Sequence, residues 1–317
     1  MKNTTIIRKL GTVDCDIVEA NPVVWQGRLL RFEYIRARND KKGYYANRTG
    51  NSYFRFVDQQ SGEILPSFGH GLHMGNAFVW ENRMIVTAVE DWGKSRFYQL
   101  ESDDLVNWSA PRVILEDPAW KGYNTTLCRA DDCFILAFEL GAPAELVKVP
   151  FTMFFARSFD LKTWEVIPDA VFGQDIYTGG PMLRYFDGFF YFFYLDGSYE
   201  KGFNTCVARS KDLKKWQWSS KNPVLPYSED DRKLFETFTP SLKKYIAEAE
   251  NINASDLDMC EFEGVLEMVY SWGNQRGTEF LARAQVDMTE KDFCEYFFKN
   301  IIYSMQVDFL RPLSYFY

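Results

Sequence analysis

The chain has 317 residues, and its 44 acidic and 36 basic side chains give a net charge of −8. This acidic balance and the absence of a basic run argue against nucleic acid and anionic membranes as partners. No stretch of about 18 apolar residues occurs and the first residues lack the apolar core of a signal peptide, so we expect no membrane span and a cytoplasmic location.

Five β-hairpins are predicted, each made of two β-rich runs around a two-residue turn. In chain order they cover residues 22–34, 76–89, 125–138, 181–194 and 259–270. Their turns are Gln26-Gly27, Glu81-Asn82, Asp131-Asp132, Asp187-Gly188 and Glu263-Gly264. Aromatic residues make up 17 % of the chain, an excess that suits both packed sheet faces and sugar-binding clefts.

A seven-residue phrase, Ser-x-Asp-Leu-x-x-Trp, follows three of the hairpins and begins at Ser102, Ser158 and Ser210. Its Asp can accept backbone N–H groups in a tight turn, while Leu and Trp anchor the outer strands. Self-similarity at a period of roughly 50 residues indicates a repeat architecture. The sequence therefore predicts an all-β fold: one five-bladed β-propeller domain over residues 1–317, with four-stranded antiparallel blades.

Two segments interrupt the pattern. Residues 230–250 are predicted to form a helical insertion, with Leu234, Leu242, Ile246 and Ala249 on one side. Residues 298–317 are apolar and irregular, which is compatible with either a closing strand or a tail.

Polar side chains recur where the first strand of each hairpin starts and the second ends. Because the two strands are antiparallel, these points lie on one face of the disc, around the central channel. Crowded carboxylates raise each other's pKa, and a general acid requires such a raised pKa. Any one of these acidic residues, taken alone, is explained as a solvated surface charge. The residues predicted to line this cavity are Glu19, Asn21, Asn76, Asn124, Glu139, Asp196, Asp256 and Asp258.

Two further features have both a functional and a purely structural interpretation. His73 precedes the second hairpin and is either a turn histidine or a sugar ligand. Trp272, Asn274 and Arg276 form either a sugar platform or a tight hairpin around a packed tryptophan.

The six cysteines lack a C-x-x-C spacing and only two histidines occur, so we expect free thiols and no zinc site. No cofactor is expected, and a structural cation in the central channel is left open.

The hairpins and their repeat phrases resemble the five-bladed propeller glycoside hydrolases, family 43 and its relatives the arabinanases, β-xylosidases and invertases, over residues 13–297. The resemblance implies carboxylates at the starts of blades one, three and four: a base Asp, a second Asp and an acid Glu. The matching positions hold Asn21, Asn124 or Thr125, and Gly179. The chain thus resembles a divergent subgroup without the usual acidic triad.

We therefore expect a glycoside hydrolase that cleaves a small oligosaccharide with carboxylates from elsewhere in the cavity. Glu139 is the predicted general acid and Asp256 the second carboxylate, with Asp258 tuning the acid by its charge. The alternatives are a non-catalytic sugar-binding propeller and a glycoside phosphorylase, for which Arg276 is a candidate phosphate ligand. The sugar, the anomeric outcome and the oligomeric state are left open.

Overall fold

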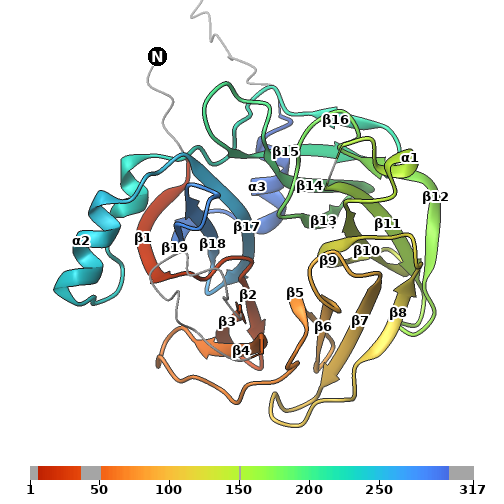
Figure 1. The fold of residues 1–317 in the computed structure, drawn as a ribbon, viewed down its shortest axis with the longest axis horizontal. Coiled ribbons are helices and arrows are strands. Elements are labelled where there is room, and N and C mark those ends of the chain that lie inside the picture. Colours follow the sequence, from red (N-terminus) through yellow and green to blue (C-terminus); the bar gives the residue numbers. More distant parts are fainter. Residues whose placement is uncertain (1–5, 37–50, 150, 300–317) are drawn as a thin grey trace, which may run out of the picture.

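The computed structural model describes residues 6–36, 51–149 and 151–299. Five antiparallel sheets are arranged around a central axis as the blades of a propeller (Figure 1). All five predicted hairpins are present, and each forms the two inner strands of one blade. The predicted all-β, five-bladed fold is confirmed.

Blades two, three and four each use four consecutive strands. Blade two contains β5 (His73–Trp80), β6 (Arg83–Val89), β7 (Arg96–Ser102) and β8 (Arg112–Glu116). Blade three contains β9 (Gly122–Ala130), β10 (Cys133–Leu140), β11 (Thr152–Ser158) and β12 (Glu165–Phe172). Blade four contains β13 (Met182–Phe186), β14 (Phe189–Asp196), β15 (Asn204–Ser210) and β16 (Trp216–Trp218).

Blade one differs from the predicted four strands, because its regular sheet has three: β2 (Asn21–Trp25), β3 (Arg28–Ile35) and β4 (Tyr53–Asp58). The expected fourth edge is reduced to two isolated bridges to β4, made by Ile64 and Phe68. Pro66 lies between them and has no N–H to donate, which interrupts a regular ladder.

The N-terminus closes the ring. Blade five consists of β17 (Asn253–Phe262), β18 (Val265–Gly273), β19 (Glu279–Val286) and, as its outer strand, β1 (Arg8–Cys15). The closing strand is therefore β1. Residues 300–317, most of the segment for which we predicted a closing strand or a tail, lie outside the described residues.

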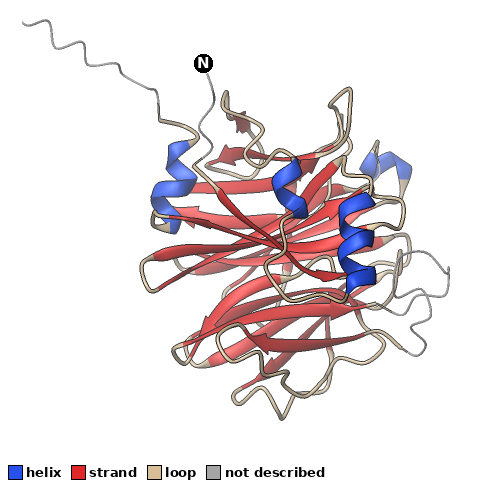
Figure 2. Cartoon of the chain, turned by 90° about the vertical axis from the view of Figure 1, so that its left-hand side faces the viewer, coloured by secondary structure: helices blue, strands red, loops and turns tan. Residues whose placement is uncertain are grey.

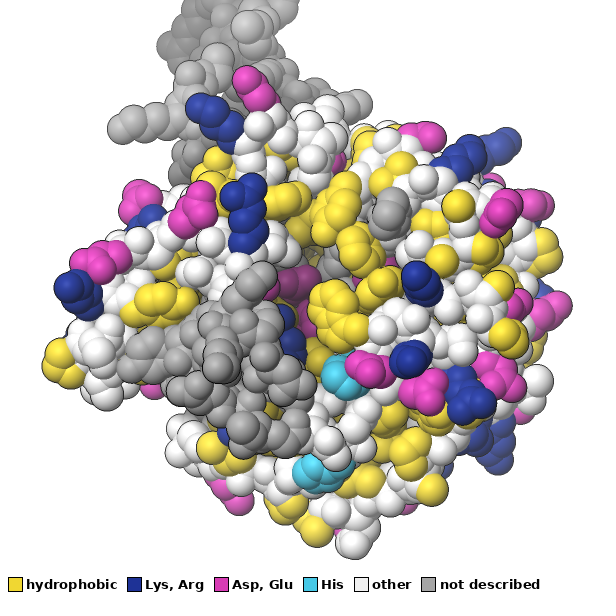
Figure 3. Space-filling view, in the orientation of Figure 1, with side chains coloured by type: hydrophobic (Ala, Val, Ile, Leu, Met, Phe, Trp, Pro, Cys, Tyr) yellow, Lys and Arg dark blue, Asp and Glu magenta, His cyan; other side chains and the backbone are white. Residues whose placement is uncertain are grey.

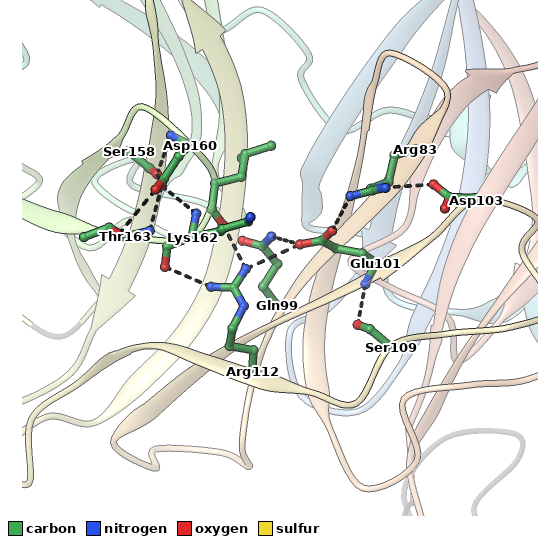
Figure 4. Close-up of polar contacts among 11 residues, drawn as sticks. Arg83, Gln99, Glu101, Asp103, Ser109, Arg112, Ser158, Asp160, Lys162 and Thr163 are labelled. Carbon is green, nitrogen blue, oxygen red and sulfur yellow. Dashed lines mark hydrogen bonds and ion pairs between the residues drawn. The ribbon is translucent and has the colours of Figure 1, made fainter.

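In blades two, three and four the repeat phrase attaches the blade to the one before it. In the third blade Asp160 Oδ1 accepts the backbone N–H groups of Lys162 and Thr163, both at 2.8 Å, as predicted for this turn (Figure 4). The turn is bound from blade two by Arg112, whose guanidinium donates to the carbonyls of Leu161 and Lys162 at 2.8 and 2.9 Å.

The tryptophan of the phrase packs against the preceding blade. Trp108 of blade two stacks on Phe68 beside blade one, with ring centroids 3.6 Å apart. Trp216 of blade four packs on Phe172 of blade three and donates its indole N–H to the Val171 carbonyl at 2.9 Å. The phrase thus holds the blades in the register that forms the central channel.

Helices lie outside the sheets (Figure 2). The predicted insertion contains the 3-10 turn η1 (Glu229–Arg232) and α2 (Pro240–Glu248), which buries Leu242 and Ile246 as expected. Leu234 is an exception: it precedes α2 and is 40 % exposed. Two short helices were not predicted, α1 (Ala144–Val147) and α3 (Glu290–Tyr296). In the described part of the chain, no helix has the length and apolar character needed to cross a membrane.

Candidate functional site

A cavity of about 100 Å³ opens at one mouth of the central channel. Acidic side chains lie at the base of a hollow near the middle of this face (Figure 3). The polar side chains that line the cavity come from blades one, three, four and five or the segments leading into them: Glu19, Arg36, Tyr123, Asn124, Glu139, Tyr177, Thr178, Asn253, Asp256, Gln275 and Glu279.

Glu139 lies near the end of β10, in the wall of the cavity. Its side chain is buried, with 1 % exposed. Oε2 accepts hydrogen bonds from the backbone N–H and the side-chain amide of Asn124, at 3.2 and 2.9 Å. Oε1 is buried and has no hydrogen-bond partner. Burial raises the pKa of Glu139 well above its ordinary value. The two hydrogen bonds from Asn124 lower this pKa, and the negative charges of Glu19 and Asp256 raise it further.

Glu19 reaches the same cavity from the segment that enters blade one, with its backbone in the left-handed region at φ 55°. Burial raises the pKa of Glu19 to about 8, supported by the charge of Asp256 and opposed by that of Arg36. Three carboxyl groups therefore share one low-dielectric space and cannot all ionise together.

Asp256 is aimed into the cavity by a bulge in β17. The register between β17 and β18 shifts between Ser255 and Asp258, and Asp256 itself has a φ of 50°. The Ser255 hydroxyl donates to Oδ2 at 3.0 Å. Burial raises the pKa of Asp256, while the neighbouring Ser271 and Ser255 hydroxyls and the charge of Arg36 oppose this shift.

Two glycines at the entry to blade four make room for these carboxylates. A Cβ at Gly180 would lie 2.3 Å from Oδ1 of Asp256, and one at Gly179 would lie 3.5 Å from Oε1 of Glu139. Gly180 also has a φ of 56°, which a residue with a side chain rarely adopts. The resemblance implies an acid at Gly179. In this structure Gly179 and Gly180 instead provide bare backbone, against which Glu139 and Asp256 lie.

Arg36 is the one basic residue in the lining, as far as the chain is described. Its guanidinium forms an ion pair with Glu279 across the cavity mouth, between the end of blade one and β19. The amide of Gln275 lies beside them and donates to the Ser255 hydroxyl at 3.2 Å. Arg36 was not a predicted site residue. Nothing in its local sequence marks it, because its role arises from closure of the ring.

Aromatic side chains form one wall of the cavity. Neighbouring rings meet edge to face: Trp92 with Tyr123 at 5.7 Å, Tyr123 with Phe151 at 4.9 Å, and Phe151 with Tyr177 at 5.3 Å. Trp92 is 54 % exposed and Tyr177 40 %. Exposed ring faces beside carboxylates are the composition of a sugar-binding wall. These four were missed in the sequence, although each lies close to a strand end on the predicted face.

The predicted platform around Trp272 is wrong. The Trp272 side chain is fully buried, stacks on Phe280 at 4.2 Å, and donates its indole N–H to the Thr12 hydroxyl at 3.0 Å. Asn274 Oδ1 accepts the N–H groups of Arg276 and Thr278, so it caps the turn. Arg276 is exposed and outside the cavity lining. The structural interpretation, a tight hairpin around a packed tryptophan, is the correct one.

Three other predicted residues lie outside the cavity lining. His73 binds the hydroxyls of Tyr34 and Ser52, at 2.6 and 3.0 Å. Asn21 pairs with both backbone groups of Ala77, at 2.9 and 3.0 Å, and so joins blades one and two. Asp196 accepts the backbone N–H of Ser198 at 2.8 Å and lines a separate pocket at the edge of the disc.

Asn76 and Asp258 lie deeper in the channel, where it narrows below the cavity and continues to the opposite face. Asp258 accepts from Arg184 at 2.6 Å and from Asn76 at 3.1 Å. Its charge is matched there by Arg184, so the predicted tuning of Glu139 by Asp258 is wrong. The charges that raise the pKa of Glu139 are those of Glu19 and Asp256. The bulge in β17 separates Asp256 from Asp258.

The described residues contain no cluster of three or more His, Cys, Asp or Glu side chains suited to hold a metal ion. The six cysteines are all free thiols.

The raised pKa of Glu19 predicts a pH-dependent stability. Between the ordinary value of 4.5 and about 8, the native state keeps a proton that the unfolded state has lost. The free energy of unfolding therefore falls as pH rises through this window, by at most about 1.4 kcal/mol per pH unit. In Glu19→Gln this slope should be shallower, as measured by urea unfolding at a series of pH values. Equal slopes in the two proteins would contradict a proton on Glu19.

No protein-family model matches the chain, and no curated protein matches its sequence. Solved structures do match. An α-L-arabinofuranosidase from Podospora anserina, in complex with cellotriose, superposes with a TM-score of 0.59 at 9 % identity, over 87 % of this chain and 94 % of that one. An α-L-arabinofuranosidase from Fusarium graminearum, with an iminosugar inhibitor, gives 0.57 at 11 % identity, over 88 % and 98 %.

A xylan β-1,4-xylosidase from Bacillus halodurans C-125 gives a TM-score of 0.58 at 14 % identity, covering 91 % of this chain and 55 % of the xylosidase. At such low identities the matches show a shared fold. The resemblance to the five-bladed propeller glycoside hydrolases is confirmed at that level, and family 43 and family 32 enzymes are among the matches.

Proposed function

We propose that this protein is a glycoside hydrolase that cleaves a small oligosaccharide in the central cavity, with Glu139 as general acid. One observation carries the proposal: Oε1 of Glu139 is buried without a partner in a cavity that a second carboxylate, Asp256, also lines. A protonated carboxyl there can donate to a glycosidic oxygen, as acid catalysis of glycoside cleavage requires.

Asp256 is the second carboxylate of the proposed reaction, on the side of the glycosidic bond opposite to Glu139. Of the three shared carboxyls it has the lowest ordinary pKa, 3.8 against 4.5 for Glu19 and Glu139. It also receives a hydrogen bond from the Ser255 hydroxyl, and the positive charge of Arg36 favours its ionised form. We therefore assign the ionised role to Asp256, whose negative charge favours the protonated forms of Glu139 and Glu19.

In the proposed reaction, the aromatic wall contacts a sugar face while Glu139 protonates the leaving oxygen. Asp256 activates a water molecule or attacks the anomeric carbon directly. In the first case Asp256 takes a proton from the attacking water and later releases it to solvent, from which Glu139 regains its own proton. In the second case a water molecule attacks the glycosyl-Asp256 ester, gives its proton to Glu139 and its hydroxyl to the product, and releases Asp256. The lining contains four acids and a single arginine, which is already paired with Glu279, so a neutral sugar fits better than a uronic acid.

A sugar-binding propeller without turnover is the second candidate, and it has one specific observation in its favour. The positions of the usual triad hold Asn21, Asn124 and Gly179, and in this fold they serve structural roles. The phosphorylase alternative loses its proposed phosphate ligand, because Arg276 lies outside the cavity lining.

Turnover of aryl xylosides, arabinofuranosides and fructofuranosides, measured against pH, tests the proposal. We expect a bell-shaped profile whose alkaline limb lies well above pH 4.5, the ordinary pKa of Glu139, because activity is lost when Glu139 loses its proton. The acid limb should lie above 3.8, because the pKa of Asp256 is also raised. Sugar binding without turnover on any substrate would favour the binding module, and dependence on phosphate would favour a phosphorylase.

A further inference from the structure

A second pocket, of about 360 Å³, lies at the seam between the outer strands of blades three and four. Its walls combine aromatic rings with carboxylate and amide groups: Phe172, Gln174, Asp175, Asp196, Trp216 and Trp218. Neither the proposed reaction nor the propeller core requires an open pocket at this place.

Trp218 gives the pocket an exposed ring on a rigid support. Its side chain is 55 % exposed, although indoles are normally largely buried. The backbone of Trp218 pairs with Ala208 at the end of β16, and its ring packs against buried Phe172 with centroids 6.1 Å apart. A ring held in this way can bind an apolar ligand face with little loss of conformational freedom.

Polar groups suited to hydroxyls surround that ring. Asp196 is held in place by the backbone N–H and the hydroxyl of Ser198, at 2.8 and 2.5 Å. Gln174 is fixed by its amide, which donates to the Leu146 carbonyl at 3.0 Å. The lining includes no Lys or Arg, so an anionic ligand is disfavoured.

The pocket is separated from the central cavity by one short segment. Tyr177 lines the cavity, and its neighbour Ile176 lines the pocket. At the end of the adjoining strand β14, Leu195 lines the cavity and its neighbour Asp196 lines the pocket. The two segments are joined by the hydrogen bond from the Gly197 N–H to the Tyr177 carbonyl, at 3.0 Å. A chain molecule that leaves the cavity over Tyr177 would therefore meet the pocket next.

We propose that this pocket is a distal binding site for a neutral saccharide unit, which engages the far end of an oligosaccharide whose near end occupies the central cavity. The proposal extends the function proposed for the cavity. An exposed indole flanked by fixed carboxylate and amide groups provides the two contacts that a sugar offers, an apolar ring face and a set of hydroxyls. The expected preference is for longer neutral oligosaccharides over short ones.

Binding is best measured in a Glu139→Gln background, which removes turnover, using xylo-, arabino- and cello-oligosaccharides from disaccharide to hexasaccharide. Trp218→Ala should lower the affinity for the hexasaccharide roughly tenfold more than that for the disaccharide. Asp196→Ala should act in the same direction, so that a folding defect in one variant does not decide the result.

Two controls define the effect. Trp92→Ala removes a similarly exposed indole from the central cavity and should weaken ligands of every length. Phe159→Ala removes a ring that is 61 % exposed and lies outside both linings, and should change nothing.

Equal losses for short and long ligands in Trp218→Ala and Asp196→Ala, or no binding of any sugar in the panel, would overturn the distal site. Binding of a polyamine at Trp218 without sugar binding would overturn it too, and would assign the pocket to cations. A length-dependent loss in a protein that never turns over sugars would leave the distal site standing and reject the hydrolase proposal alone.

Discussion

Replacing Glu139 by glutamine is expected to lower turnover by about 10²–10⁴-fold while leaving sugar binding largely intact. Glutamine has the shape of the protonated acid and can still accept from both N–H groups of Asn124. It cannot release a proton to a leaving oxygen, so the loss should appear in kcat rather than in the dissociation constant.

The matched control is Glu165→Gln, which removes a carboxylate that is 69 % exposed and paired with Arg157 on the outer surface of blade three. Such pairs contribute about 0–1 kcal/mol to stability, and neither turnover nor binding should change. Turnover in Glu139→Gln equal to that of the unsubstituted protein would remove Glu139 from the mechanism. An equal loss in Glu165→Gln would attribute the effect to general damage.

Arg184→Met is expected to have the largest effect on stability, lowering the free energy of unfolding by about 3–5 kcal/mol. Arg184 crosses the channel below the cavity, where it pairs with Asp258 at 2.6 Å and with Glu290, and donates to the Met259 carbonyl at 2.7 Å. Its loss leaves Asp258, only 5 % exposed, as a buried charge without a cation.

Urea unfolding measures this effect. The double variant Arg184→Met with Asp258→Asn should recover part of the lost stability, because the second change removes the unmatched charge. A loss below about 1 kcal/mol in the single variant, or no recovery in the double variant, would show that the pair is not a structural element of the channel.

The fold was accessible from sequence because its determinants are local and repeated. A hairpin such as 181–194 is specified by alternating β-formers around Asp187-Gly188, and the Asp160 turn by four neighbouring residues. Closure by β1 was not accessible, since its pairing with β19 joins residues from opposite ends of the chain and has no local signature. The irregular edge of blade one, two isolated bridges on either side of Pro66, was not predicted either.

The candidate site was predicted only in part, because some of its determinants are local and others are not. Strand ends placed Glu19, Glu139 and Asp256 in one cavity, because topology alone determines which face they share. The direction of a side chain at a bulge or a turn is not determined by topology. The β17 bulge therefore separated Asp256 from Asp258, and the tight turn after Trp272 buried that indole. The aromatic wall could not be predicted, because its position depends on the three-dimensional course of the segments that connect the strands.

A crystal structure of the Glu139→Gln variant with a bound neutral oligosaccharide would show whether Glu139 is placed to act as the general acid. We expect a glycosidic oxygen about 2.6–3.2 Å from the side chain at position 139, with Asp256 facing the anomeric carbon and a sugar ring against Trp92 or Tyr177. An oligosaccharide bound outside the central cavity, or one whose glycosidic oxygens all lie beyond hydrogen-bond reach of position 139, would contradict this role for Glu139.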